Sequence, residues 1–425
     1  MVIRPGKYTC FIAAALLLPA AAYASGVSES FTRTSLLLIV VITLADVCGF
    51  LFERLGMAEL LGEISAGIIL GNLALIGLDV DVSGLLRESE FMAYSSELAL
   101  VLLLFLVGLE SDMRSLLTAG RNALAVALAG VVLPVAMGIA ACMALGFATG
   151  IESWFVGAML AATSVGITAK LLGENDLVQT RSAEVILGAA VIDDVLGILL
   201  LAVLASVVVT GEVAASDLVL IISKALLFFV GALFVGQKLM PGVVHFVALN
   251  KHSSVWTGFA FCLALAFAQL AVVAGLAPLI GAFVAGLLLD DVFFRVGDHL
   301  QKHTLEELIK PITDIMLTIF FVGIGAQVQL QELADPGLLL IIVVLTVVAV
   351  ISKGGAGFMI RGEGYDRLGV GFGMIPRGEV GLVFASFAFT HGVFCGGTYS
   401  ALVMVVLLTT LLGPLLLKPR LSRFY

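Results

Sequence analysis

Hydrophobic residues occupy the chain in long uninterrupted runs that are separated by short polar stretches. A helix needs about 20 apolar residues to cross the hydrocarbon core of a bilayer. No segment alternates apolar and polar positions as the strands of a membrane β-barrel do. The pattern therefore predicts an all-α polytopic membrane protein with thirteen transmembrane segments after residue 24, at approximately 34–52, 57–78, 94–110, 122–147, 153–173, 182–210, 217–240, 254–273, 276–291, 309–328, 337–360, 366–391 and 399–417.

The overall composition agrees with this pattern. Hydrophobic residues make up 61% of the 425 residues and charged residues only 12%, and the mean hydropathy is +1.16. A soluble domain carries about 25% charged residues, so a soluble core could not cover this much apolar surface. The formal net charge of −9 excludes a nucleic-acid-binding role, which needs a basic face. The five cysteines lie singly in apolar stretches, without the spacing of a metal site or a disulfide framework.

The first residues have the features of a signal peptide. Arg4 and Lys7 precede a short apolar run, and the sequence Ala22-Tyr23-Ala24 has the small-x-small form of a cleavage site. We expect residues 1–24 to be a signal peptide, and the alternative is an uncleaved first helix.

The loops between the segments differ in charge when they are taken alternately. Lys and Arg concentrate in cytoplasmic loops, so this difference predicts orientation. We expect a multi-pass protein of a bacterial inner membrane, with a periplasmic mature N-terminus and a cytoplasmic C-terminus. One set of loops carries Arg33 and Arg87, and the other carries Arg54, Arg114, Arg121, Lys170, Arg181, Lys238, Lys251, Arg295, Lys302, Lys310, Arg361, Arg367, Lys418, Arg420 and Arg423.

Two adjacent aspartates, Asp193 and Asp194, lie in the middle of the segment 182–210. A charged side chain at the centre of a bilayer costs at least about 2.5 kcal/mol, so such a group faces a cavity, a partner or an ion. Neighbouring carboxylates repel each other, and burial disfavours their charged forms, so at least one could exchange a proton near neutral pH. Carboxylate oxygens are also hard ligands for a small cation. The pair is our candidate ion- and proton-binding site, including for Na⁺; the structural alternative is one capping or paired aspartate and one idle one.

Polar, glycine-containing stretches interrupt two of the apolar segments, at 163–168 and at 375–381. Paired interruptions of this kind at matching positions of two halves point to a midplane binding site in secondary transporters. Thr163, Ser164 and Thr168 are therefore candidate ion ligands, although hydroxyls in membrane helices commonly bond to the preceding turn. In the second stretch we expect Arg377 and Glu379 to pair with each other, either as a structural ion pair or with a role in transport.

Two further charged residues each have two interpretations. Lys353 is followed by Gly354 and Gly355, so its helix could approach another helix closely and the amine could neutralise an aspartate. A lysine can instead extend along apolar surface to reach an interface. Glu63, near the start of 57–78, could lie at a cytoplasmic entrance or cap a helix.

The order and spacing of six short stretches resemble the monovalent cation:proton antiporter superfamily, in its second subfamily of bacterial Na⁺/H⁺ antiporters and Kef-type membrane domains. The matching stretches cover nearly the whole mature chain. They are GEISAGIILG at 62–71, LFLVGLE at 104–110, ATSVGIT at 162–168, VIDDV at 191–195, FFVGIG at 320–325 and PRGEVG at 376–381.

The resemblance implies inverted repeats, two crossed discontinuous helices at 153–173 and 366–391, and a homodimer. It divides the membrane domain, 25–425, into core helices at approximately 122–210 and 337–417 and dimerisation helices at approximately 34–110 and 217–328. By position, Asp194 matches the ion-binding carboxylate of the family. Asp193 matches a position that is Asp in electrogenic members. Some electrogenic relatives carry a lysine partner for this aspartate in the helix equivalent to 309–328, which has no base after Lys310 here, so we expect Asp193 to lack a built-in counter-ion.

These observations favour a secondary antiporter that exchanges a monovalent cation, Na⁺ before K⁺, for protons. The alternatives are K⁺/H⁺ exchange, a non-transporting membrane sensor or channel, and Na⁺-coupled uptake of an organic anion. The sequence contains no arrangement of a nucleophile with a base and no phosphate-binding loop. We therefore expect no enzymatic activity and no cofactor, with the ions acting as transported substrates.

Overall fold

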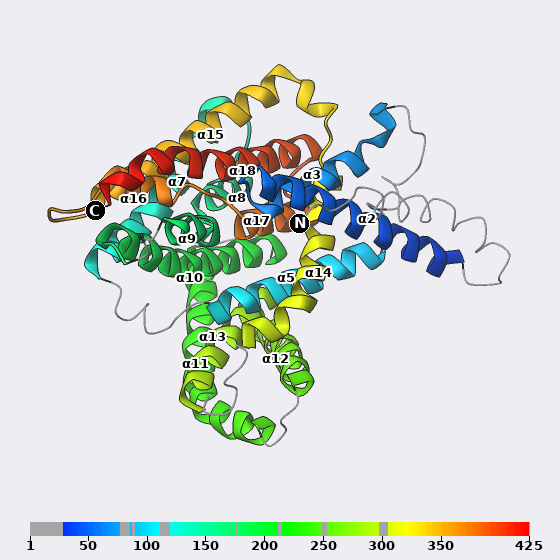
Figure 1. Cartoon of the computed structure of the whole chain (residues 1–425), viewed down its shortest axis with the longest axis vertical. Helices are drawn as coiled ribbons and strands as arrows, with labels where there is room; N and C mark the ends of the chain where they lie inside the picture. Colours follow the sequence, from blue (N-terminus) through cyan, green and yellow to red (C-terminus); the bar gives the residue numbers. More distant parts are fainter. Residues whose placement is uncertain are drawn as a thin grey trace. The chain divides into compact units, whose positions relative to one another are not determined.

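The computed structural model describes residues 29–76, 86, 90–110, 120–175, 177, 179–210, 215–248, 253–296 and 305–424, and the predicted signal peptide at 1–24 lies outside them. All regular structure in these ranges is helical (Figure 1). Short 3₁₀ turns at Leu73–Ile76, Glu332–Ala334, Gly357–Met359 and Lys418–Arg423 join or extend the α-helices. The α-helices are α2 (Glu29–Arg54), α3 (Glu59–Gly71), α5 (Glu90–Glu110), α7 (Arg121–Leu145), α8 (Ile151–Ala161), α9 (Val165–Glu174), α10 (Arg181–Thr210), α11 (Ala215–Ala248), α12 (Ser253–Val273), α13 (Pro278–Val296), α14 (Leu305–Ala326), α15 (Pro336–Ala356), α16 (Arg367–Gly373), α17 (Glu379–Thr390) and α18 (Gly396–Leu417).

Ten spans within the described residues are long and apolar enough to cross a membrane. The protein is therefore a multi-pass membrane protein, as its hydropathy predicts. Three of the thirteen predicted segments contain no such helix. Segment 57–78 forms the 13-residue α3, segment 276–291 has a short apolar helix over Pro278–Leu289, and segment 366–391 is divided between α16 and α17. The number of membrane crossings stays a prediction.

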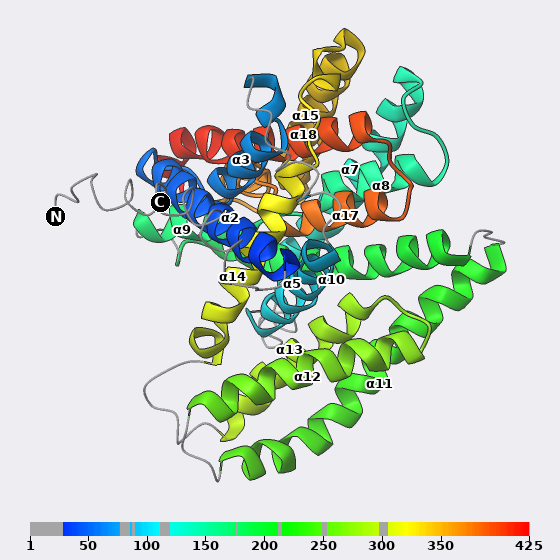
Figure 2. The ribbon, with the colours of Figure 1, turned by 90° about the vertical axis from the view of Figure 1, so that its right-hand side faces the viewer.

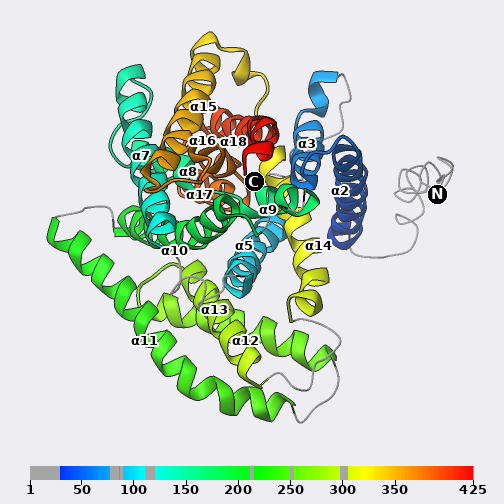
Figure 3. The same cartoon turned by 60° about the vertical axis from the view of Figure 1, so that its left-hand side comes forward.

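The chain divides into two compact units. The first combines the described residues up to Ala99 with Asp314–Leu330, and the second combines Leu100–Thr313 with Gln331–Tyr425. In the second unit α7 packs against α8, α10 and α15, while α15 also contacts α16 and α18 (Figure 3). Helix α13 packs against both α12 and α11 (Figure 2). The core around α7, α10 and α16 is built largely from alanine and aliphatic side chains, which lets these helices approach closely.

The ends of two helices in the second unit are defined by local chemistry. Asp335 precedes α15, and its side chain accepts a hydrogen bond from the Gly337 amide at 2.9 Å. Pro336 occupies the first turn, where its missing amide hydrogen costs nothing. Gly146 ends α7 in the left-handed conformation, with φ of 61°, which glycine adopts without steric strain.

In the first unit, α3 and α14 cross with their backbones almost in contact. A Cβ atom added to Gly67 would lie 2.9 Å from the Gly325 Cα and would also overlap the Val322 carbonyl. Next to this crossing the Asn72 side chain donates to the Val328 carbonyl at 2.9 Å. Small residues at such crossings allow close helix packing in membranes, where the hydrophobic effect between helices is weak.

Glu63 also lies in the first unit, in the second turn of α3. Its Oε1 accepts a hydrogen bond from the Thr318 hydroxyl of α14 at 2.7 Å. The interpretation of Glu63 as a helix cap is therefore wrong, because its carboxylate bonds to a side chain of another helix.

Replacing Gly67 by alanine is expected to lower the thermal stability of the detergent-solubilised protein, since the new methyl group must separate α3 from α14. Overpacking of this kind costs about 1–3 kcal/mol. The matched control is Gly323→Ala in α14, because a Cβ there meets only the Ser96 hydroxyl at 3.7 Å. Melting curves recorded by size-exclusion chromatography give the melting temperatures of both variants. Equal melting temperatures would show that the crossing of α3 and α14 tolerates a methyl group.

Candidate functional site

Two helices of the second unit are interrupted. Helix α8 ends at Ala161 and α9 begins at Val165, with Ala162 and Ser164 in extended or near-extended backbone conformations. Helix α16 ends at Gly373 and α17 begins at Glu379. The ends of helices leave amide and carbonyl groups without intrahelical partners. In a membrane protein those groups must find partners within the protein or line a cavity.

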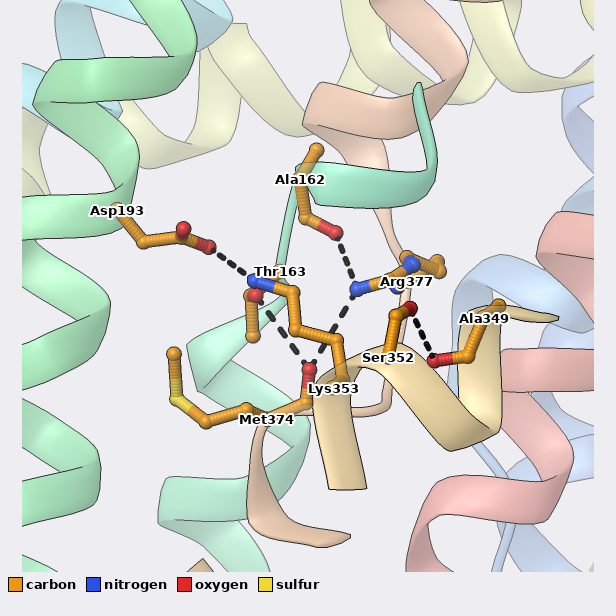
Figure 4. A network of polar contacts seen from close by, with 8 residues as sticks. All are labelled: Ala162, Thr163, Asp193, Ala349, Ser352, Lys353, Met374 and Arg377. Carbon is orange, nitrogen blue, oxygen red and sulfur yellow. Dashed lines mark hydrogen bonds and ion pairs between the residues drawn. The ribbon is translucent and has the colours of Figure 1, made fainter. Parts of the chain in front are cut away.

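The two interruptions supply partners to each other. The Ser164 amide donates to the Pro376 carbonyl at 2.9 Å. The Thr168 hydroxyl donates to the Gly373 carbonyl at 2.7 Å, and the Thr163 hydroxyl donates to the Met374 carbonyl at 3.4 Å (Figure 4). The predicted ligand residues of the first stretch therefore join the two interruptions directly.

Glycine is needed where these segments touch. A Cβ atom on Gly378 would lie 2.7 Å from both Cβ and Oγ of Ser164. On the other side, Gly413 of α18 faces Pro376, and a Cβ there would overlap the proline ring. A side chain at Gly378 would push the two interrupted segments apart, and one at Gly413 would push α18 away from the second interruption.

The expected direct pair of Arg377 and Glu379 is not formed. Arg377, 1% exposed, donates through Nη1 to the Ala162 carbonyl at 2.8 Å and to the Met374 carbonyl at 3.5 Å. Glu379 accepts a hydrogen bond from the Ser164 hydroxyl at 3.4 Å. The prediction was wrong because the two side chains find partners across the interruptions, on a stretch more than 200 residues away. Within the described chain, Nε and Nη2 of Arg377 have no hydrogen-bond partner.

The aspartate pair lies in the middle of α10. Asp193 is buried, at 2% exposure, and Asp194 is half-buried. Successive residues of an α-helix point about 100° apart, so the two carboxylates have different surroundings. The Asp193 Oδ1 atom has no hydrogen-bond partner among the described residues.

The counter-ion of Asp193 is Lys353, from α15. Its Nζ lies 3.0 Å from Oδ2 of Asp193, and the lysine side chain is 0% exposed (Figure 4). The expectation that Asp193 lacks a built-in counter-ion is therefore wrong, as is the interpretation of Lys353 as a lysine reaching an interface. The base comes from the segment 337–360 rather than from 309–328. A buried charge requires a close partner of opposite sign, and this pair supplies one.

One residue of the site gave no signal in the sequence. Thr410 of α18 donates its hydroxyl to the Arg377 carbonyl in the second interruption. A threonine in an apolar helix is ordinary, and only the fold shows that this one faces the interruption.

Carboxylates, hydroxyls and carbonyls are the oxygen ligands that hard cations prefer. The described residues contain no group of three or more His, Cys, Asp or Glu side chains that could hold a metal ion. The Asp193–Asp194 pair places carboxylate oxygens of this kind close to the ammonium group of Lys353.

The chain is similar to known membrane proteins over most of its length. The family model described as the transmembrane sodium/hydrogen exchanger matches residues 37–423. The chain is 34% identical to the high-affinity Na⁺/H⁺ antiporter NhaS3 of Synechocystis, over 89% of this chain and 87% of that protein. It is 32% identical to the Na⁺/H⁺–K⁺ antiporter GerN of Bacillus cereus, over 92% of this chain and 96% of that protein.

The fold is also similar to a solved structure. The sodium/proton antiporter MjNhaP1 of Methanocaldococcus jannaschii matches with a TM-score of 0.65 and 17% identity, covering 93% of this chain and 97% of that one. At this identity the match shows the fold alone. The family match makes the protein a transporter and not an enzyme, and the chain belongs to the sodium/hydrogen exchanger family of membrane proteins.

Proposed function

We propose that this protein exchanges a monovalent cation, preferentially Na⁺, for protons, and that Asp193 and Asp194 bind both ions in competition. The observation that supports the proposal best is the buried contact of 3.0 Å between Lys353 and Asp193. An ammonium group beside two carboxylates in a membrane helix leaves one negative charge to be neutralised. That charge is the minimal requirement for binding either a cation or a proton.

Electrostatics explains how the two ions exclude each other. When Asp193, Asp194 and Lys353 are all ionised, two negative charges and one positive charge remain. A cation that binds at Asp194 adds positive charge close to the Lys353 ammonium, and like charges in a low-dielectric site repel strongly. Binding of the cation therefore favours a state of these three side chains with one proton fewer, and departure of the cation favours the return of the proton.

The ligands other than carboxylates come from the interruptions in this proposal. The Thr163 and Ser164 hydroxyls donate their hydrogens to Met374 and Glu379, and each hydroxyl oxygen still has lone pairs that can accept. Carbonyls freed by the breaks add further oxygen ligands. The Arg377 and Glu379 charges stabilise the break rather than bind the ion.

The architecture we propose has thirteen membrane crossings arranged as inverted repeats, with α8–α9 and α16–α17 as the crossed discontinuous helices. The helices at 122–210 and 337–417 form the moving core, and those at 34–110 and 217–328 form the dimerisation part of a homodimer. The protein lies in a bacterial inner membrane with its C-terminus in the cytoplasm, following the loop charges, and residues 1–24 act as a signal peptide. Cysteine labelling of the loops from either side tests this orientation.

Proton flux in everted vesicles tests the proposed exchange. With a proton gradient established, addition of Na⁺ or Li⁺ is expected to dissipate the gradient, and K⁺ to do so less, between about pH 6.5 and 9. A pH-sensitive dye reports the change, and vesicles from cells without the protein are the control. No response to any of the three cations at any pH would overturn the proposal.

Potassium/proton exchange is the second candidate, because the relative GerN is named for both Na⁺ and K⁺. A larger response to K⁺ than to Na⁺ in the same vesicles would favour it. A channel would conduct cations without moving protons, and a sensor would give no flux.

A further inference from the structure

We propose that Gly130 of α7 is a positioning residue for the proposed exchange, because its missing side chain creates the space in which the Lys353 amine reaches Asp193. The inference rests on the proposed function for its effect on transport. Its effect on the Lys353–Asp193 pair rests on geometry alone.

Gly130 lies next to the charged end of the Lys353 side chain. A Cβ atom on Gly130 would lie 3.2 Å from Lys353 Nζ, 3.7 Å from its Cδ and 3.9 Å from its Cε. These three atoms are the nearest neighbours of that Cβ, so the space beside Gly130 is occupied by the outer half of the lysine. The amine at 3.2 Å is the tightest of the three contacts, and it is the atom that contacts Asp193.

The surrounding helices leave the amine little freedom. Helix α7 packs against both α10, which carries Asp193, and α15, which carries Lys353. The Lys353 side chain is fully buried, so it cannot turn to solvent when its path is narrowed. Pro134, four residues after Gly130, cannot donate the amide hydrogen that normally bonds to the Gly130 carbonyl. This turn of α7 thus combines minimal bulk with a weakened helical hydrogen-bond ladder beside the amine.

The charges around Lys353 determine what a displacement of the amine does. Asp193 and Asp194 of α10 and Arg377 of the second interruption are the charged groups that act electrostatically on it. Arg121 is the only charged residue of α7, at its exposed start, and Lys353 is the only one of α15. Moving the amine away from Asp193 lengthens the buried contact between Lys353 Nζ and Asp193 Oδ2, so the ion pair stabilises the protein less.

The test compares two Gly→Ala variants in exchange assays. Gly130→Ala is expected to change the dependence of proton flux on Na⁺ concentration, with a half-maximal concentration that differs from wild type by about threefold or more. The matched control is Gly355→Ala in α15, since a Cβ there meets only the Leu133 Cδ1 atom at 3.9 Å. Its Na⁺ dependence is expected to match that of wild type. Identical Na⁺ dependence for the two variants would overturn the inference.

A double-mutant cycle of thermal stability tests the role of Gly130 independently of the proposed function, because it requires no transport measurement. Gly130→Ala is expected to lower the melting temperature in detergent when Lys353 is present and to have no such effect in a Lys353→Met background. Equal destabilisation in both backgrounds would assign Gly130 to ordinary helix packing and overturn the inference. If the wild-type protein moved no protons with any cation, the proposed function would fail while this cycle still decided the role of Gly130.

Discussion

Replacing Asp194 by asparagine is expected to abolish cation-dependent proton movement while the protein remains folded. Asparagine has nearly the same volume as aspartate but carries no charge to attract a cation and no titratable proton in this pH range. Asp194 is half-buried on α10, whereas Asp193 is buried and contacts Lys353, so in the proposed site we assign the exchangeable ion to Asp194. Proton flux in everted vesicles with Na⁺, Li⁺ or K⁺ measures the remaining exchange. We expect it to fall to the flux of vesicles without the protein.

The matched control is the same change at the neighbouring position. Asp193→Asn removes the partner of Lys353 but leaves Asp194, so we expect reduced exchange that moves less net charge per cycle. A voltage-sensitive dye distinguishes the two variants, since electrogenic exchange responds to membrane potential and electroneutral exchange does not. Normal exchange by Asp194→Asn in protein of wild-type melting temperature would show that the proposed site is wrong.

Features that depend on local sequence could be predicted. The apolar runs predict a helical membrane fold because a helix needs about 20 apolar residues to cross a bilayer. The interruptions at 163–168 and 375–381 were visible because glycine, proline and hydroxyl side chains are unusual together in an apolar segment. The structure has helix ends at both places, after Ala161 and after Gly373.

Partners that lie far apart in the sequence could not be predicted. Arg377 and Glu379 look like a pair because they are neighbours, yet each bonds to the stretch around residues 162–164. Lys353 and Asp193 are 160 residues apart, and the sequence alone allowed the lysine either an aspartate or an interface. Which of the two partners Lys353 contacts depends on how α15 and α10 pack around α7. The hydropathy of the sequence contains no information about this packing.

The proximity of Gly130 to Lys353 illustrates the same limit. A glycine in an apolar helix is commonly a site of helix packing, and Gly138 of the same helix does lie close to the Gly157 Cα of α8. The two glycines look alike in the sequence. Their neighbours differ, because one faces a backbone and the other faces a charged side chain.

Replacing Lys353 by methionine is expected to destabilise the protein strongly, because it leaves Asp193 buried without its partner. Removing one member of a buried ion pair costs about 3–5 kcal/mol, and Asp193 already has one carboxylate oxygen without a hydrogen bond. Methionine fills most of the volume of the lysine side chain, so a loss of packing contributes little. Melting curves in detergent are expected to show a large decrease in melting temperature relative to wild type.

Two further variants test whether loss of the ion pair causes the expected decrease in stability. Lys310→Met removes a lysine that lies exposed on α14, and it is expected to leave the melting temperature near that of wild type. Adding Asp193→Asn to Lys353→Met is expected to recover most of the lost stability, because replacing both members of a buried pair by neutral groups is often nearly neutral. If the double variant stayed as unstable as Lys353→Met alone, the cost would come from the shape of the lysine side chain, and the buried charge pair would not be what holds α15 to α10.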